Sequence, residues 1–377
     1  MTGTLFHMVA KIMSKRMNKI EKLIAELCLE GVEFKELKDV AKSITTGKLN
    51  ANAQAENGAY PFFTCDANPF KINTFAFDVE AIIVSGNGSQ VGHINYYHGK
   101  FNAYQRTYVI SDFKCVDVKY ILHYLRGYLR KYIFENSRKG SIPYITMPML
   151  ENFLIPILPL PIQQEIVKIL DTFTELEAEL EAELEARKKQ YEYYREELLT
   201  LVRDVWWKTL GELITLEYGK PLKGSERDGG SFPVLGSNGR VGFHSSYLIK
   251  GPCIIIGRKG SAGVVVWEES NCYPIDTTFF VKDQNDKILL KYLFYKFQTL
   301  NLAIDKQDGG VPGLNRNDVY KIKIPIPPLA EQESIVAILD KFDALVNDIS
   351  IGLPAELKAR RQQYEYYRGK LLTFKSI

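Results

Sequence analysis

The sequence predicts an α+β protein in which two similar mixed α/β domains are separated by two long helices that pair as an antiparallel coiled coil. Three observations support this prediction. The hexapeptide QYEYYR occurs twice. Each copy lies near the end of a stretch whose apolar residues recur every three or four positions, as in a long amphipathic helix. Between these stretches, β-branched runs alternate with Gly-rich loops, a pattern typical of strands and turns.

The repeat extends far beyond the hexapeptide. IPILPLPIQQEIVKILDTF, which begins at Ile155, is matched by IPIPPLAEQESIVAILDKF, which begins at Ile324. In the same way, AIIVSGNGSQVG at Ala81 matches CIIIGRKGSAGV at Cys253, and GSIPYIT matches GGVPGLN. The chain has 377 residues, 46% of them hydrophobic, which is enough for two or three domains with cores of their own. A period this long indicates a tandem domain duplication.

The first 16 residues differ from those that follow. Their apolar patch, residues 5–10, is shorter than a signal peptide requires. Met17 opens the more regular sequence MNKIEKLIAEL. We expect residues 1–16 to be a disordered arm or upstream translation, which leaves open whether Met17 is the true start. The first domain is expected at residues 17–160.

Both domains are expected to mix strands with helices. AFDVEAIIVSGNGSQVGHINYY and GPCIIIGRKGSAGVVVWEE each predict a strand, a Gly-rich loop and a second strand, and YPFFT and FPVLG predict short strands. Helical segments are expected at residues 119–134 and 287–305. The second domain is expected at residues 205–328.

The two long helices are expected at residues 161–204 and 329–377. The first, at about 1.5 Å per residue, would form a rod of roughly 60 Å. The second contains Gly352 and Pro354, and we expect a break near 352–354 because an interior proline disrupts a helix. Tyrosines of the repeated hexapeptide are interpreted as packing residues, with a docking patch for another subunit as the alternative. The residues predicted to pair the helices are Ile166, Ile169, Phe173, Leu176, Leu180, Leu184, Ile335, Ile338, Phe342, Leu345 and Ile349.

Charge is distributed unevenly along the chain, whose net charge is +3. Residues 31–154 contain 14 Lys and Arg against 11 Asp and Glu, and residues 205–330 contain 16 against 12. Residues 162–204 contain 6 against 12. The simplest interpretation is a solvated surface throughout. The more specific one is that basic domains contact a polyanion while the acidic helix contacts protein.

The loops carry the candidate DNA-binding residues, because Arg, Lys, Asn, Gln and Ser are the side chains that contact phosphates and base edges. Ordinary polar turns are the alternative explanation. Loops at matching positions of the two copies carry different residues, SGNGSQ against GRKGSA, which favours two domains that read different sequences. The candidates are Lys48, Asn87, Ser89, Gln90, Arg106, Arg138, Lys139, Ser141 and Tyr144 in the first domain, and Lys220, Asn238, Arg240, Arg258, Lys259, Ser261, Asn315 and Arg316 in the second.

No catalytic motif is convincing. DANPF at Asp66 is similar to the Asn-Pro-Pro-aromatic motif of amino-methyltransferases but lacks the second proline. The loop SGNGSQVG leads into a strand instead of a helix, which disfavours a dinucleotide site. There is no Walker loop, and the five histidines and five cysteines show no metal spacing. No apolar run approaches a membrane span. We therefore expect a cytoplasmic, non-catalytic protein with no metal, no cofactor of its own and no membrane contact.

The matched segments IPILPLPIQQEIVKILD and IPIPPLAEQESIVAILD, the doubled QYEYYR and openings such as GVEFKEL resemble the specificity subunit of a type I restriction-modification system. The resemblance runs from Met17 to the C-terminus. It implies two target-recognition domains that each read one half of a bipartite, asymmetric double-stranded DNA target. It also implies that the helices dock two methyltransferase subunits, that restriction/motor subunits complete the complex, and that these partners use S-adenosylmethionine, ATP and magnesium.

Two alternatives belong to other classes of protein. A coiled-coil adaptor would not bind DNA even with a methyltransferase present. A catalytic methyltransferase or nuclease subunit would bind cofactor as an isolated chain.

Overall fold

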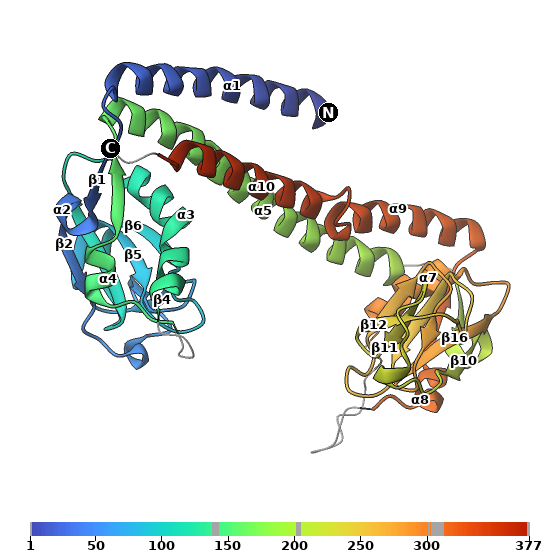
Figure 1. Cartoon of the computed structure of the whole chain (residues 1–377). Coiled ribbons are helices and arrows are strands. Elements are labelled where there is room, and N and C mark those ends of the chain that lie inside the picture. Colours follow the sequence, from blue (N-terminus) through green and yellow to red (C-terminus); the bar gives the residue numbers. More distant parts are fainter. Residues whose placement is uncertain (1, 138–142, 201–204, 301, 303–312, 375–377) are drawn as a thin grey trace. The chain divides into compact units, whose positions relative to one another are not determined.

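The computed structural model describes residues 2–137, 143–200, 205–300, 302 and 313–374, with the side chains of residues 2–14 left aside. The chain divides into two compact units (Figure 1). Unit 1 comprises Met1–Leu180 together with Leu357–Ile377, and unit 2 comprises Glu181–Glu356. The first unit is therefore completed by the C-terminal end of the chain.

Unit 1 is built around a six-stranded sheet in the order β2-β7-β5-β6-β3-β4. The neighbours are antiparallel except for β3 and β6, which are parallel. A separate antiparallel pair, β1 and β8, joins the start of the domain to its end. The strands are β1 (Glu33–Glu36), β2 (Ala41–Thr46), β3 (Tyr60–Phe63), β4 (Phe70–Ile72), β5 (Phe77–Ser85), β6 (Ile94–Ala103), β7 (Thr107–Phe113) and β8 (Leu154–Ile157).

The main core of unit 1 lies between this sheet and its helices. β5 carries an unbroken buried run, as expected for a strand covered on both faces. Tyr120, Leu125 and Ile133 of α3 are buried in the same core as Ile82 and Val84. The helices are α1 (Thr2–Leu27), α2 (Leu37–Val40), the 3₁₀ turn η1 (Ala51–Ala53), α3 (Val118–Asn136) and α4 (Met147–Glu151), followed by the 41-residue α5 (Leu160–Thr200).

Residues 2–16 belong to helix α1, which continues to Leu27. The end of this helix packs on unit 1, where Met17 and Ile20 are buried. Arg16 donates a hydrogen bond to the carbonyl of Lys168, and Lys19 pairs with Glu165 at 2.9 Å. These contacts place α1 along the beginning of α5.

Unit 2 repeats the strand order of unit 1 with one difference. Its four-stranded sheet β10-β16-β13-β14 corresponds to β2-β7-β5-β6, but the long strand β6 is replaced by the two shorter strands β14 and β15. A three-stranded sheet, β12-β11-β15, is therefore separate, and β9 pairs with β17. The strands are β9 (Trp206–Thr209), β10 (Ile214–Tyr218), β11 (Phe232–Gly236), β12 (Gly239–His244), β13 (Cys253–Gly257), β14 (Val265–Glu268), β15 (Tyr273–Pro274), β16 (Thr278–Gln284) and β17 (Lys323–Ile326).

The helices of unit 2 pack on this sheet much as those of unit 1 do. Tyr292, Leu293 and Tyr295 of α7 are fully buried in a core with Ile254 and Ile256 of β13. The helices are α6 (Leu210–Leu213), the 3₁₀ turn η2 (Gly224–Glu226), α7 (Leu290–Thr299), α8 (Arg316–Lys321), α9 (Leu329–Asn347) and α10 (Leu353–Leu372), the last of which continues into unit 1.

The same buried hydrogen bonds recur in both copies. Gln163 donates to the carbonyl of Leu158 and accepts from the Asp117 amide, and Gln332 makes the equivalent bonds to Pro327 and Leu289. Because an unpaired buried amide is costly, these glutamines fix how each long helix leaves its domain. The two mixed α/β domains and the long helices of the predicted fold class are thus confirmed.

Helix pairing occurs inside each unit and explains why QYEYYR is present twice. In unit 1, Phe173 of α5 stacks on Tyr367 of α10 at 5.2 Å, and Glu177 pairs with Arg361. Residue numbers rise along one helix as they fall along the other, so the pair is antiparallel. In unit 2, Phe342 of α9 stacks on Tyr194 of α5 at 5.6 Å. Each hexapeptide therefore packs on the helix and domain of the other copy.

The predicted pairing residues divide into two groups. Ile166, Ile169, Phe173 and Ile335 are buried, and Leu176, Leu180, Leu184 and Phe342 are partly buried. By contrast, Ile338 and Leu345 are 39% and 37% exposed, and Ile349 is 78% exposed in the turn after α9. The buried stripe of α9 instead includes Leu339 and Val346. In unit 1, Arg16 and Lys19 of α1 contact Lys168 and Glu165, next to Ile169, which is the counterpart of Ile338 in the repeat.

The second long helix is interrupted between α9 and α10. α9 ends at Asn347 and α10 begins at Leu353, with Pro354 in its first turn, where no helical hydrogen bond is lost. A Cβ on Gly352 would lie 2.5 Å from the carbonyl oxygen of Ala344 and 2.7 Å from that of Leu345. The turn therefore requires glycine because the backbone passes so close to the end of α9. None of the described helices is long and apolar enough to cross a membrane.

Candidate nucleic-acid interface

The Gly-rich loop of unit 2, residues 258–264, is closed by its own backbone. The Gly257 amide donates to Val264 and the Gly263 amide donates back to Gly257, both at 2.8 Å. Gly260 and Gly263 have φ values of +76° and +83°, which side-chain-bearing residues rarely adopt. The loop is further fixed at Arg258, whose amide donates to Thr277 and whose carbonyl accepts from Leu314. The sequence thus folds a short basic segment into a defined shape.

Arg258 and Arg316 meet at the ring of Tyr218, the last residue of β10. Their guanidinium carbons lie 5.0 Å and 5.2 Å from the centre of that ring. Arg258 also donates from Nη2 to the carbonyl of Asp276 at 2.9 Å, and Arg316 donates from Nη1 to the carbonyl of Leu216 at 3.2 Å. The Nε atom of each arginine is buried without a hydrogen-bond partner. We call these three residues the arginine–tyrosine cluster.

The other candidates of unit 2 lie around this cluster with different roles. Lys259 is exposed and forms a β-bridge with Gly313. The side chain of Asn315 caps helix α8 by accepting from the Asn317 amide. Arg240 pairs with Glu268 at 3.5 Å. Asn238 and Lys220 are exposed, and Ser261 is partly buried within the Gly-rich loop.

Unit 1 assembles its candidate loops with the same backbone frame. The Gly86 amide donates to the Arg106 carbonyl, and the Gly86 carbonyl accepts from Ile145. This brings together the loops that carry Asn87, Arg106 and Tyr144. Ser89, Gln90, Arg106, Tyr144 and Lys48 are exposed, while Asn87 is partly buried. Arg138, Lys139 and Ser141 lie outside the described residues.

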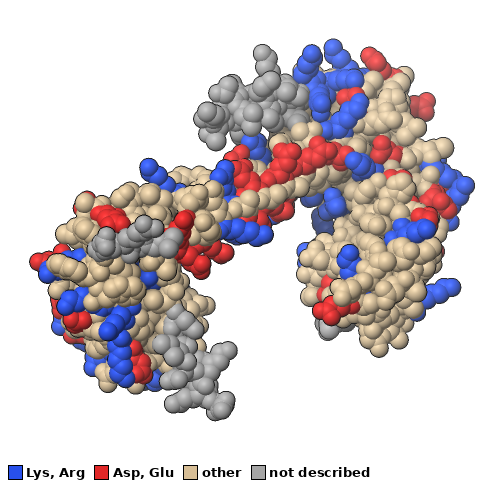
Figure 2. Space-filling view, turned by 180° about the vertical axis from the view of Figure 1, so that it is seen from behind, with Lys and Arg blue, Asp and Glu red and all other residues tan. Residues whose placement is uncertain are grey.

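The two frames present different side chains. By the alignment of the repeats, the counterparts of Tyr218, Arg258 and Arg316 are Thr46, Gly86 and Met147. Unit 1 therefore lacks the arginine–tyrosine cluster. Figure 2 shows Lys and Arg intermixed with Asp and Glu over the globular parts, and a band of Asp and Glu along the long helices. The excess of Lys and Arg in each domain suits a polyanion, and an acidic helix does not.

A buried histidine network in unit 1 was not predicted from the sequence. His123 of α3 is 2.9 Å from Asp171 through Nε2 and 2.9 Å from the Tyr364 hydroxyl through Nδ1. Burial lowers the pKa of His123 although the Asp171 hydrogen bond opposes this. Burial would raise the pKa of Asp171, but hydrogen bonds from His123 and Lys119 hold it below its usual value. These partners fit a neutral imidazole that donates to Asp171 and accepts from Tyr364.

The corresponding position in unit 2 has a different network. Tyr295 replaces His123 and donates to Asp340 at 2.5 Å, and the pKa of Tyr295 is raised by burial and then by this bond. The Tyr191 hydroxyl, which corresponds to that of Tyr364, is buried without a partner. Both networks join a domain to a helix and are far from the Gly-rich loops in the chain. They are structural, and no periodicity or motif could have revealed them.

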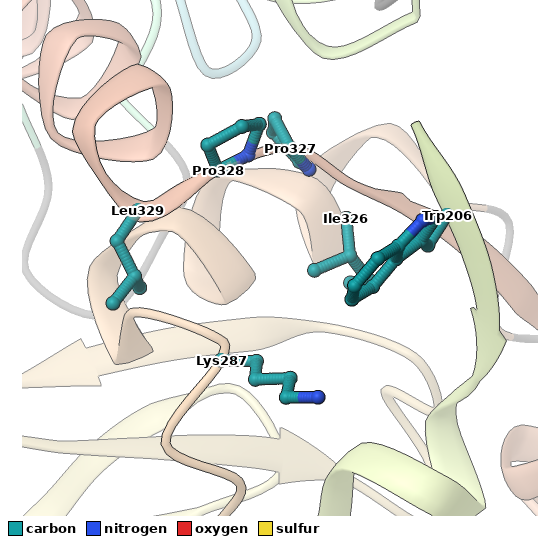
Figure 3. Close-up of a pocket in the computed structure, with 6 residues that line it drawn as sticks. All are labelled: Trp206, Lys287, Ile326, Pro327, Pro328 and Leu329. Carbon is teal, nitrogen blue, oxygen red and sulfur yellow. The ribbon is translucent and has the colours of Figure 1, made fainter. Parts of the chain in front are cut away.

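A pocket of about 470 Å³ lies in unit 2 where α9 begins (Figure 3). It is mostly apolar, and Trp206 at its edge is 68% exposed with the Lys287 amine 5.4 Å from its ring. Exposed apolar surface of this kind is typical of protein interaction sites. Among the residues that the structure describes, no group of His, Cys, Asp and Glu could hold a metal ion. The pocket is lined by Trp206, Lys287, Ile326, Pro327, Pro328 and Leu329.

Comparison with known proteins places these features in a family. The family described as type I restriction modification DNA specificity domain matches residues 29–186 and 204–359. A putative type I restriction enzyme specificity subunit of Haemophilus influenzae is 32% identical over 390 residues, which cover 94% of this chain and 100% of that protein. The EcoR124I/EcoR124II specificity subunit of Escherichia coli is 31% identical over 357 residues, with 78% and 86% covered.

Solved structures share the fold. The S subunit of a type I restriction-modification system from M. genitalium has a TM-score of 0.62 at 20% identity, covering 91% of this chain and 96% of that one. A chain from a study of complex assembly in the type I system has a TM-score of 0.55 at 15% identity, with 91% and 97% covered. Together with the two family matches, these likenesses show that this chain belongs to the specificity subunits of type I restriction-modification systems, the non-catalytic subunits that recognise DNA through two target-recognition domains.

Proposed function

We propose that each target-recognition domain of this chain reads one half of a bipartite, asymmetric double-stranded DNA target. The observation that carries this proposal is the shared backbone frame with unlike side chains. In both units a closed Gly-rich loop is held by the same pair of backbone hydrogen bonds, at Gly86 and at Arg258. Different side chains on one frame are what two different half-sites require, since base edges are read by side chains.

The candidate contacts are the exposed and partly buried residues of those loops. Arg106, Asn87 and Gln90 serve unit 1 in this proposal, and Arg258, Lys259 and Arg316 serve unit 2. Asn315 and Arg240 are weaker candidates, because their side chains already cap α8 and pair with Glu268. Arg138, Lys139 and Ser141 remain predictions from the sequence.

The test is methylome sequencing of a bacterium that expresses this chain with its methyltransferase partner. We expect a motif made of two short specified parts separated by unspecified base pairs, because two separate domains read it. A single continuous motif, or methylation unchanged by deletion of this chain, would contradict the proposal. In the same proposal, S-adenosylmethionine, ATP and magnesium are bound by partner subunits, and the complex acts in the cytoplasm.

Partner docking is proposed at the long helices. The middle tyrosine of each hexapeptide is exposed, Tyr193 by 62% and Tyr366 by 64%, whereas the tyrosines on either side pack within their units. Exposed aromatic residues at matched positions are suited to two equivalent contacts. We propose that one methyltransferase subunit docks at each, with the Trp206 pocket extending the surface on unit 2.

This docking can be tested with Tyr193→Glu and Tyr366→Glu. Each variant should bind one methyltransferase instead of two, and the double variant none, because a carboxylate at the contact would be desolvated. Native mass spectrometry of the assembled complex gives the stoichiometry. Tyr191→Phe serves as the control, since its ring is buried within unit 2 and its hydroxyl has no partner. Full assembly of the double variant would rule out these positions.

A further inference from the structure

The arginine–tyrosine cluster concentrates positive charge, and none of the described acidic residues neutralises it. Of the residues that the structure describes, no carboxylate pairs with Arg258 or Arg316, although Arg240 in the same unit pairs with Glu268. The guanidinium carbons of Arg258 and Arg316 nevertheless lie 5.0 Å and 5.2 Å from the centre of the Tyr218 ring. Two cations that contact the same ring repel each other, so the arrangement favours a ligand whose hydrogen-bond acceptors carry partial negative charge.

The cluster also fixes the orientation of each guanidinium. One terminal nitrogen of each arginine donates to a backbone carbonyl, that of Asp276 for Arg258 and that of Leu216 for Arg316. Nη1 of Arg258 and Nη2 of Arg316 have no hydrogen-bond partner among the described residues. Tyr218 is itself held by Phe279, with the ring centres 4.9 Å apart. Each arginine is thus clamped on one side and available on the other.

Orientation distinguishes a base reader from a phosphate contact. A phosphate can be bound by a flexible cation, and the exposed Lys259 beside the cluster is suited to that role. A base edge must be met by donors in a set direction. Guanine presents two acceptors, O6 and N7, in the major groove, and arginine is the side chain that matches them most often.

We infer that Tyr218 is a positioning residue that presents Arg258 and Arg316 to a guanine in the half-site read by the second domain. This inference rests on the proposed bipartite reading and adds the base class that unit 2 recognises. Unit 1 has Thr46, Gly86 and Met147 at the matching positions. Its half-site therefore provides an internal control on the same DNA molecule.

The experiment uses the chain assembled with its methyltransferase and a DNA library with both half-sites randomised. The wild-type complex should select a split motif with a guanine in the half specified by unit 2. Arg258→Lys and Arg316→Lys keep the charge but lose the planar fork, so each should reduce the preference for that guanine by on the order of 5- to 150-fold. The half specified by unit 1 should stay unchanged.

Tyrosine variants separate positioning from packing. Tyr218→Leu should lose the guanine preference while binding to random DNA at low salt is kept, because both charges remain. Tyr218→Phe should restore the preference, because the ring and not the hydroxyl holds the guanidinium groups. Melting curves of both variants show whether the unit is folded. Should the leucine variant unfold, the two lysine variants decide the question alone.

Lys259→Gln is the matched control for phosphate binding. This variant should weaken binding to all DNA sequences alike and reduce the salt dependence of binding. The inference is wrong when the two Arg→Lys variants behave like this control, with uniformly weaker binding and an unchanged motif. It is also wrong when the unit 2 half-site contains no guanine that these variants affect. A wild-type complex that selects no split motif would instead refute the proposed function itself.

Discussion

At the scale of single residues, the repeated chain has diverged where its copies meet the long helices. Tyr364 and Tyr191 occupy the same place in the two hexapeptides, but only Tyr364 has a hydrogen-bond partner, His123. The difference arises because Tyr295 in unit 2 turns its hydroxyl to Asp340 instead. The same tyrosine hydroxyl is therefore expected to stabilise the fold at Tyr364 but not at Tyr191.

The matched pair Tyr364→Phe and Tyr191→Phe tests this inequality. Tyr364→Phe should lower the free energy of unfolding by about 1–3 kcal/mol, because the buried Nδ1 of His123 loses its donor. Tyr191→Phe should be neutral or stabilising, because it removes a hydroxyl that has no partner. Urea unfolding of the two variants gives both values. Equal destabilisation would contradict the assigned network.

Protonation of His123 should make unit 1 sensitive to mild acid. Its pKa in the folded chain lies below the usual value of about 6.5, so the unfolded chain takes up the proton first as the pH falls. The stability that it contributes is therefore complete above about pH 6.5 and is lost below it. The lowered pKa of Asp171 adds a second loss only in stronger acid, near pH 4 and below.

Thermal melting between pH 7.5 and pH 5 measures this effect. His123→Gln should melt at a lower temperature at pH 7.5 but should lose less on acidification than the wild type. Tyr364→Phe, which keeps the imidazole, should retain the pH dependence. If the melting temperatures of His123→Gln and the wild type fall by the same amount between these pH values, another group is responsible.

At the scale of elements, the second long helix is divided into α9 and α10 by a turn that requires glycine at position 352. The close approach of Gly352 to the carbonyl oxygens of Ala344, Leu345 and Asp348 leaves no room for a side chain. The interruption thus depends on a contact with the end of α9 as well as on Pro354. A continuous helix such as α5 has no such requirement.

Gly352→Ala should destabilise the chain by about 1–3 kcal/mol, the usual cost of overpacking a tight site. The control is Gly369→Ala in α10, where a Cβ would meet nothing within 4 Å. That change should stabilise by about 0.5–1 kcal/mol, because alanine is the better helix former. Chemical unfolding distinguishes the two substitutions. A neutral Gly352→Ala would mean that the turn can relax without cost.

At the scale of the whole molecule, the chain crosses between its two units twice, through α5 and through α10. The first hexapeptide belongs to unit 2, and the second belongs to unit 1 together with the N-terminal domain. Each unit nevertheless has its own sheet, its own core and its own Gly-rich loop. Separate cores are the physical basis for the proposed independent reading of two half-sites.

Exchange of residues 211–323 for the matching segment of a relative should rewrite only one half of the methylated motif. The other half should persist because unit 1 keeps all its loops, and the number of unspecified base pairs should persist because the long helices are untouched. Methylome sequencing of the chimaera gives the answer. A motif altered in both halves would mean that the two domains form one composite DNA surface.

The sequence by itself determined the duplication, the long helices and the family, because repeats and apolar periodicity can be read directly from the order of the residues. It also placed the candidate loops at matching positions. Only the tertiary structure decided which domain each hexapeptide packs on, because two identical segments have identical local preferences. Only the tertiary structure likewise decided which side of α9 is exposed, that His123 contacts Tyr364, and that Arg258 and Arg316 both contact Tyr218. These contacts join residues far apart in the chain, and their energies depend on burial that arises only when the separate elements pack together.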